Sequence, residues 1–270
     1  MVQNIKNLLE KYNVTPNKVL GQNFLINEGV ADELIKATCL TKDDTVVEVG
    51  PGTGVITKKL AQIAKKVIAV EKDPKLIPIL QKELKTFLNI EIINEDILKF
   101  NPANYSLQTT CLPDRQAHYS LLGAPPYYLT GRLFRHFLEL SLIRPTQISL
   151  IIQKNVAQRI IAKPPKSNIL ATSIQFYGEP SIINIISKNS FWPRPKVDSA
   201  ILVIKDIKNP TTNEQNFFKI VRAGFSSPRK QLKSNLKQQF KLDTALEIDF
   251  SRRAETLTIK EWAYLTEKLR

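Results

Sequence analysis

The sequence predicts an α/β protein with a parallel sheet, followed by a small helical domain. Short β-branched runs such as TVVEVG (residues 45–50) alternate with helical segments such as VITKKLAQIAKK (55–66), the pattern of strands joined by crossover helices. The 270 residues are enough for one large domain and a smaller companion. From residue 213 onward the spacing is helical. We therefore expect a first domain over residues 1–207 and a second over 208–270.

The elements follow one another in a regular order. An amphipathic helix is expected near residues 1–14. Strands are expected within 45–50, 66–73, 90–100, 119–123, 146–153, 173–187 and 196–207, and helices within 55–66, 74–87, 131–140 and 154–163. Because strands and helices alternate, helices should cover both faces of the sheet.

Composition and charge restrict the class of partner. The chain has 39 Lys and Arg against 25 Asp and Glu, a formal charge of +14, which favours binding to nucleic acid. No apolar run reaches the roughly 20 residues of a membrane span, and no export signal is visible. Cys39 and Cys111 have no metal-ligand spacing, so neither a disulfide scaffold nor a metal site is expected. These features favour a cytoplasmic protein.

A glycine-rich turn follows the strand at residues 45–49. Gly50, Gly52 and Gly54 allow a ligand to approach the backbone at the start of a helix. A dinucleotide-binding turn would place its third glycine at position 55, which is Val55. The order acid-x-Gly-x-Gly-x-Gly, beginning at Glu48, instead favours S-adenosylmethionine. A purely structural tight turn is the alternative.

Acidic residues stand at the ends of the next two expected strands. Glu71 is placed to accept hydrogen bonds from both hydroxyls of a ribose, and Asp96 from an adenine amino group. Strand ends are often acidic because they are solvated, so each acid alone is ambiguous. Together with the glycine turn they predict a nucleoside-containing cofactor.

Eight motifs occur in the order found in the rRNA adenine N6-dimethyltransferases. They are KVLGQNFLIN, VVEVGPGTGVIT, AVEKD, NEDIL, PPYYLTG, IIQKNVAQRI, FWPRPKVDSAIL and FSSPRKQLKSNL, between residues 18 and 237. The chain resembles most closely the bacterial small-subunit type. This resemblance implies a class I, Rossmann-like S-adenosylmethionine-dependent methyltransferase fold with a small C-terminal helical RNA-binding domain.

The resemblance also implies roles for individual residues. The segment Gln22 to Leu25, with Asn23 and Phe24, would fold over the cofactor. The cofactor-binding set is Gln22, Asn23, Leu25, Glu48, Gly50, Gly52, Gly54, Glu71, Lys72, Asp96, Ile97 and Ala124. The implied substrate is a pair of adjacent adenines near the 3′ end of small-subunit rRNA in the immature small ribosomal subunit, each methylated twice by a monomeric enzyme that leaves S-adenosylhomocysteine as its product.

A base must leave its stack before its amine can be methylated, and aromatic side chains replace the lost stacking. Within the resemblance, Ala124, Pro126, Tyr127 and Phe191 are the catalytic positions, with Tyr127 and Phe191 as the two faces of a base clamp. A core aromatic and a loop anchor are the alternatives for these two rings.

Basic residues in FSSPRKQLKSNLK suit contacts to RNA phosphates. Arg229, Lys233 and Lys237 recur at intervals of four, with Lys230 beside them, and would form one stripe on a continuous helix. Arg222 is a further candidate, and Lys154 a weaker one. A solvated surface helix is the alternative interpretation.

The sequence departs from the family at Ala124, where the pattern has Asn or Asp. That polar residue accepts hydrogen bonds from the target amine, which an alanine side chain cannot do. An engineered change, a natural loss of catalysis and a slow enzyme would each account for it. The alternatives for function are a non-catalytic RNA-binding factor in ribosome assembly or transcription, and a large-subunit rRNA methyltransferase conferring antibiotic resistance. The long segment 107–120 has no physical explanation.

Overall fold

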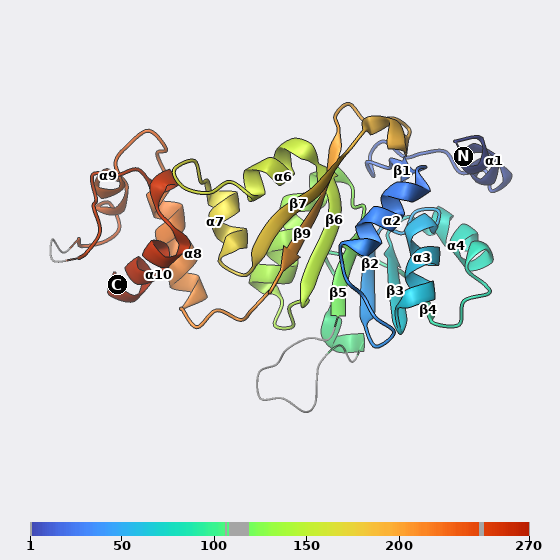
Figure 1. Cartoon of the computed structure of the whole chain (residues 1–270), viewed down its shortest axis with the longest axis horizontal. Helices are drawn as coiled ribbons and strands as arrows, with labels where there is room; N and C mark the ends of the chain where they lie inside the picture. Colours follow the sequence, from blue (N-terminus) through green and yellow to red (C-terminus); the bar gives the residue numbers. More distant parts are fainter. Residues whose placement is uncertain (1, 106, 108–118, 243–245, 270) are drawn as a thin grey trace. The chain divides into compact units, whose positions relative to one another are not determined.

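A computed structural model describes residues 2–105, 107, 119–242 and 246–269 (Figure 1). It divides into two compact units. Unit 1 comprises residues 1–157 and 181–207, and unit 2 comprises 158–180 and 208–270. In the part of the chain that is described, no helix is both long and apolar enough to cross a membrane.

Unit 1 is built around a seven-stranded sheet in the order β4-β3-β2-β5-β6-β9-β7. The strands are β2 (Thr45–Val49), β3 (Lys66–Glu71), β4 (Ile90–Asn94), β5 (Tyr119–Gly123), β6 (Gln147–Gln153), β7 (Glu179–Ile186) and β9 (Ser199–Lys205). The first five of these are parallel, and β9 runs antiparallel to β6. This sheet and its helices confirm the predicted α/β fold with a largely parallel sheet.

Helices connect these strands as the alternating sequence pattern predicts. They are α1 (Val2–Lys11), α2 (Glu28–Lys36), α3 (Val55–Ile63), α4 (Ile77–Glu83), α5 (Thr130–Phe134), followed directly by the π-helical turn Arg135–Leu140, and α6 (Lys154–Ile160). The side chain of Asn27 accepts a hydrogen bond from Gly29 N and so caps α2, while Gly54 begins α3. In Figure 1, α2 and α3 lie across the strands of the sheet.

Side chains that point alternately to the two faces of the sheet form the core. Val46 and Leu122 pack with buried residues of α2 and α3 on one face. Val47 and Leu121, one position along, are equally buried and point to the opposite face. Because both faces are covered, most positions of these strands are apolar, although β2 also carries the buried Glu48 and β5 the buried Ser120.

A two-stranded sheet joins the start of the chain to a late loop. In β1 (Phe24–Leu25) and β8 (Phe191–Trp192), Phe24 pairs with Trp192 and Leu25 with Phe191. The sequence analysis expected no strand at residues 24–25 or 191–192 and did not predict this pairing. A two-residue strand is too short to leave a periodic signal.

Unit 2 is helical and includes α7 (Ile169–Gln175), α8 (Glu214–Gly224), α9 (Leu232–Leu236) and α10 (Ile259–Lys268). The rings of Phe176 and Phe217 stack at 3.7 Å, which joins the end of α7 to α8. This stacking explains why residues 158–180 belong to unit 2, although the sequence analysis placed them in the first domain. Residues 173–175, within the segment expected to hold a strand, belong instead to α7, whose first turn Asn168 caps.

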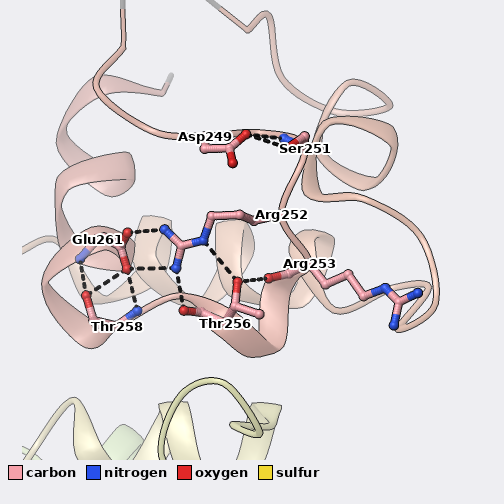
Figure 2. A network of polar contacts seen from close by, with 7 residues as sticks. All are labelled: Asp249, Ser251, Arg252, Arg253, Thr256, Thr258 and Glu261. Atoms are coloured by element: carbon pink, nitrogen blue, oxygen red, sulfur yellow. Dashed lines mark hydrogen bonds and ion pairs between the residues drawn. The ribbon is translucent and has the colours of Figure 1, made fainter.

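Arg252 organises the loop before α10 (Figure 2). Its guanidinium group donates to the carboxylate of Glu261 and to the backbone oxygen and hydroxyl of Thr256. Glu261 in turn accepts from the backbone N–H of Thr258 at 2.7 Å, and Thr258 caps the helix. The guanidinium group of Arg252 therefore holds this loop together through hydrogen bonds. The side chain of Arg253, in contrast, points away from this network in Figure 2.

Candidate active site

A cavity opens at the carboxyl ends of β2, β3, β4 and β5. Its empty volume, open solvent included, is about 830 Å³. Of the predicted site residues, Gln22, Asn23, Gly50, Gly52, Glu71, Lys72, Asp96, Ile97, Ala124, Pro126, Tyr127 and Phe191 line it, together with Phe24.

The strand order explains why the cavity is here. From β2 the chain moves outward to β3 and β4 on one side, and then to β5 and β6 on the other. Loops that leave β2 and β5 therefore diverge, and such a reversal point leaves a crevice at the carboxyl ends of the strands.

The glycine turn forms the floor of the cavity. Gly50 has φ +65°, and a Cβ atom there would meet nothing within 4 Å, so this backbone faces open space. Gly54 has φ +84° and packs against Leu80 and Leu84 instead. Gly54 thus shapes the turn without lining the cavity, which differs from its predicted position among the cofactor-binding residues.

Glu71 lies at the end of β3 and is only 6% exposed. Its Oε1 accepts from the Asp73 N–H at 2.8 Å and its Oε2 from the Gly52 N–H at 3.2 Å. Burial raises the pKa of Glu71 to about 7, although these hydrogen bonds oppose the shift. The carboxyl group is thus fixed in position with lone pairs still available to a ligand.

Asp96 follows β4 and lies beside Lys72. Asp96 Oδ2 accepts from Lys72 Nζ at 2.8 Å, and Oδ1 from the Leu98 N–H at 3.1 Å. Partial burial tends to raise the pKa of Asp96, but the hydrogen bonds and the positive charge of Lys72 outweigh it and lower the pKa. Asp96 is therefore held ionised, as an acceptor for a cofactor amine requires.

The loop after β5 carries the predicted catalytic positions. Gly123 ends the strand with φ +145°, and a Cβ atom there would lie 2.5 Å from the oxygen of Val49. Only glycine allows β5 to approach β2 this closely. Ala124 comes next, half-buried at the edge of the cavity and packed against the core. Its methyl group offers no hydrogen-bonding atom to a ligand.

Tyr127 and Phe191 reach the cavity from different segments. Tyr127 is half-buried, and its hydroxyl lies 2.7 Å from Ser199 Oγ on β9. Burial raises the pKa of this phenol, so it is neutral at physiological pH. Phe191 is 4% exposed on β8. Each ring is held by its element and lines the cavity.

Two other residues assigned to the cofactor lie behind the cavity wall. Leu25 is packed in the core under β1. Glu48 is fully buried on β2, and burial raises its pKa to about 8, with Thr57 opposing the shift. Within the described residues, neither carboxyl oxygen of Glu48 has a hydrogen-bond partner of normal geometry. Burial thus favours the protonated form of Glu48 at neutral pH.

The sequence analysis did not single out ten lining residues. They are Leu20, Gly21, Val49, Val70, Leu76, Glu95, Pro125, Tyr128, Leu129 and Ile151. Most are apolar side chains whose approach depends on tertiary packing. Tyr128 could have been predicted from the sequence, because it directly follows Tyr127. Its side chain is 50% exposed at the cavity.

The predicted RNA-binding residues all belong to unit 2 and are all exposed. They are Arg222, Arg229, Lys230, Lys233 and Lys237. The expected continuous helix is wrong, since α9 spans only Leu232–Leu236. The N–H groups of Leu232 and Lys233 donate to the oxygens of Arg252 and Phe250, which stops the helix from extending toward Arg229.

The weaker candidate Lys154 begins α6 and is half-buried. Cys39 is exposed and carries a free thiol, whereas Cys111 and residues 108–118 of the long segment lie outside the described residues.

Residues 13–269 match the ribosomal RNA adenine dimethylase family. The chain belongs to this family. A protein of Dehalococcoides mccartyi (strain BAV1) called ribosomal RNA small subunit methyltransferase A is 39% identical over 273 residues, which cover 96% of this chain and 90% of the relative. Another of the same name from Clostridium botulinum (strain Loch Maree, type A3) is 37% identical, with 98% of each protein covered. The family predicted from the motifs is confirmed.

Solved structures agree on the fold. The 23S rRNA methyltransferase ErmE superposes with a TM-score of 0.72 at 24% identity, covering 92% of this chain and 99% of that one. A dimethyladenosine transferase from Plasmodium falciparum gives 0.71 at 23% identity, with 90% and 96% covered. At these identities the likeness concerns the fold alone. This member of the adenine dimethylase family therefore has the methyltransferase fold expected from its sequence.

Proposed function

We propose that this adenine dimethylase family member uses S-adenosylmethionine to dimethylate N6 of two adjacent adenines near the 3′ end of small-subunit rRNA. The observation that carries the proposal is the single cavity wall that joins the glycine turn, Glu71 and Asp96 to the loop at Ala124–Tyr127. A cofactor held by the first group would end beside a base held by the second.

The residues present fit this cofactor. The open space over Gly50 accommodates a ligand against the backbone. Glu71 has acceptors for two ribose hydroxyls, and Asp96 an acceptor for an adenine amine, with the backbone of Ile97 beside it. When bound, S-adenosylmethionine supplies an electrophilic methyl group on a sulfonium centre. The predicted roles of Gln22, Asn23 and Lys72 stay proposals of the same kind.

The aromatic residues at the cavity would receive the target base. Tyr127 and Phe191 offer π-faces that replace the stacking lost when adenine leaves the RNA. Each transfer would form a carbon–nitrogen bond at N6, break the bond between the methyl carbon and the sulfonium sulfur so that S-adenosylhomocysteine leaves, and release one proton from the amine. Pro126 and the Leu129 N–H, which donates to the Pro126 oxygen, hold the loop in shape.

Ala124 makes this a slow enzyme. The lone pair of an adenine amine is delocalised into the ring, so an acceptor that orients the amine should stabilise the transition state. Removing one such contact costs on the order of a hundredfold in rate. The backbone oxygen of Gly123 is the nearest replacement along the chain.

Two observations support an RNA partner: the exposed positive charges of unit 2 and the names of the relatives. The five cations predicted to bind RNA are all exposed on unit 2 and are suited to phosphate contacts. The relatives at 37% and 39% identity are called small-subunit methyltransferases, which favours that subunit over the large-subunit rRNA in the name of ErmE. We further propose that the chain acts as a monomer, in the cytoplasm, on the immature small subunit.

Methyl transfer to separated ribosomal subunits tests this function. Undermethylated small subunits and mature large subunits are incubated with the chain and labelled S-adenosylmethionine, and the nucleosides are separated by mass. We expect N6,N6-dimethyladenosine in small-subunit rRNA only. Label confined to the large subunit would establish the resistance-type alternative.

A non-catalytic RNA-binding factor is the second candidate, and Ala124 is the observation that favours it. Such a factor would bind small subunits and cofactor yet transfer no methyl group even in long incubations at saturation. Binding without transfer would therefore decide for this candidate.

A further inference from the structure

The segment from Asn17 to Asn23 is a compact turn at the edge of the cavity. Asn17 Oδ1 accepts from the Val19 N–H at 2.9 Å, and Gln22 Oε1 accepts from the Asn17 N–H at 2.8 Å. A Cβ atom on Gly21 would lie 3.2 Å from Pro126 Cβ and 3.3 Å from the Tyr128 ring. The turn therefore lies directly against the loop that carries Ala124.

One side-chain hydrogen bond joins this turn to the end of β3. Gln22 Nε2 donates to Asp73 Oδ2 at 2.7 Å, across 51 positions of sequence. Asp73 is only 6% exposed, so its carboxylate depends on these partners for solvation. Its other oxygen accepts from the Lys75 N–H at 3.1 Å.

Asp73 is bonded at the same time to the carboxylate at the centre of the cavity. The Asp73 N–H donates to Glu71 Oε1, and Glu71 Oε2 accepts from Gly52 N–H. Hydrogen bonds thus run without a break from Asn17 through Gln22, Asp73 and Glu71 to the glycine turn. Both ends of the Gln22 amide are used, so rotating it would lose two bonds.

We propose that Asp73 is a positioning residue that holds the turn of residues 17–23 over the cofactor and couples it to Glu71. This inference rests on the proposed cofactor. The charged acceptor at Asp73 requires a donor at position 22, and the Asn17 N–H requires an acceptor there, which only an amide provides. Bound cofactor and an ordered turn therefore stabilise each other through Glu71 and Asp73.

Reversing the donor and the acceptor tests this pair. Asp73→Asn keeps an oxygen for the Lys75 N–H but presents an amide N–H₂ to the N–H₂ of Gln22. Adding Gln22→Glu restores a donor and an acceptor in the opposite sense, leaves an oxygen for the Asn17 N–H and returns the net charge to its original value. Asp43→Asn, an exposed aspartate before β2, is the matched control.

Two measurements compare these variants with the unchanged chain. Calorimetry gives the affinity for S-adenosylhomocysteine, and mass spectrometry follows trypsin cleavage after the exposed Lys18, which lies in the turn, without ligand. We expect Asp73→Asn to weaken binding and to accelerate cleavage by about tenfold, the effect of one charge-assisted hydrogen bond. The double variant should return within about threefold of the unchanged chain in both.

The outcomes separate this inference from the proposed function. Unchanged binding and cleavage in Asp73→Asn would overturn it, and so would a double variant as impaired as the single one. If the unchanged chain binds no S-adenosylhomocysteine, the proposed cofactor fails. Cleavage after Lys18 then still decides whether Asp73 positions the turn.

Discussion

The cavity of unit 1 and the cationic surface of unit 2 differ in how their charges are held. In the cavity, Glu71 and Asp96 each accept two hydrogen bonds, and Glu71 is buried while Asp96 is partly buried. On unit 2, Arg229 and Lys233, the latter in the short helix α9, are exposed to solvent. A fixed, desolvated group is costly to replace, whereas a solvated cation acts mainly through the summed field. Changes should therefore have large single effects in the cavity and small cumulative ones on the surface.

Glu71→Ala should produce the largest effect. It removes the proposed acceptor for both ribose hydroxyls, and two hydrogen bonds to a charged group correspond to a loss of affinity on the order of a thousandfold. Calorimetry with S-adenosylhomocysteine measures it. Glu91→Ala, which breaks only the partly exposed ion pair with Lys66, is the control. Equal affinities in the two variants would remove Glu71 from the site.

Arg252→Met tests whether the difference depends on how a group is held and not on which unit it belongs to, because this arginine lies in unit 2 yet is held by hydrogen bonds. Loss of its hydrogen bonds to Glu261 and Thr256 should lower the free energy of unfolding by about 2 kcal/mol. Urea denaturation measures the change. Arg253→Met, at an exposed neighbour, should alter stability by less than about 0.5 kcal/mol. Similar losses in both would mean that the network in Figure 2 contributes little.

Affinity for S-adenosylhomocysteine should rise with pH. The pKa of Glu71 is raised from 4.5 to about 7, and the carboxylate is the better ribose acceptor. The ionised fraction grows about tenfold between pH 6 and 8, and affinity should follow. Glu71→Gln, which cannot titrate, should give a flat profile. A pH dependence that persists in this variant would assign the titration to another group.

Stability should change in the opposite direction. Glu48 and Glu71 bind protons more tightly in the folded chain than in the unfolded chain, because burial raises both pKa values. The free energy of unfolding should therefore fall as the pH rises from about 4.5 to 8. Urea titrations across this range measure it, and Glu48→Gln should flatten the slope. A rise in stability over the same range would refute the raised pKa values.

Single changes on the cationic surface should be the smallest. Arg229→Ala or Lys233→Ala should weaken small-subunit rRNA binding by a few-fold, and each should reduce the salt slope by about 0.7 to 0.9. Filter binding at several salt concentrations checks this, with Lys260→Ala on α10 as the control. Affinity for S-adenosylhomocysteine should not change. Unaltered slopes would place the RNA contacts elsewhere.

Local patterns predicted most of the parallel sheet and the acids at its strand ends. The turn at Gly50 and the end of β3 at Glu71 can be read from strand periodicity and glycine spacing alone. The cavity wall that they share with Ala124 follows from the topology, since strands that are far apart in sequence end at the same edge.

Long-range contacts could not be predicted in this way. The bond from Gln22 to Asp73 spans 51 positions, and β1 pairs with β8 across most of unit 1. The continuous helix predicted for Arg229–Lys237 was wrong for the same reason. Backbone hydrogen bonds from α9 to the loop at Phe250–Arg252 take the place of the helical bonds that local spacing favoured. Sequence periodicity describes one element at a time and carries no information on such partners.

The most direct test of the proposed catalysis compares the unchanged chain with Ala124→Asn in methyl transfer to undermethylated small subunits, at saturating cofactor and RNA. An asparagine restores the missing acceptor without altering Glu71 or Asp96, so turnover should rise on the order of a hundredfold while the affinity for S-adenosylhomocysteine stays constant. Equal, substantial turnover by both chains would contradict the role assigned to position 124. Inactivity of both, with RNA still bound, would establish the binding-factor function instead.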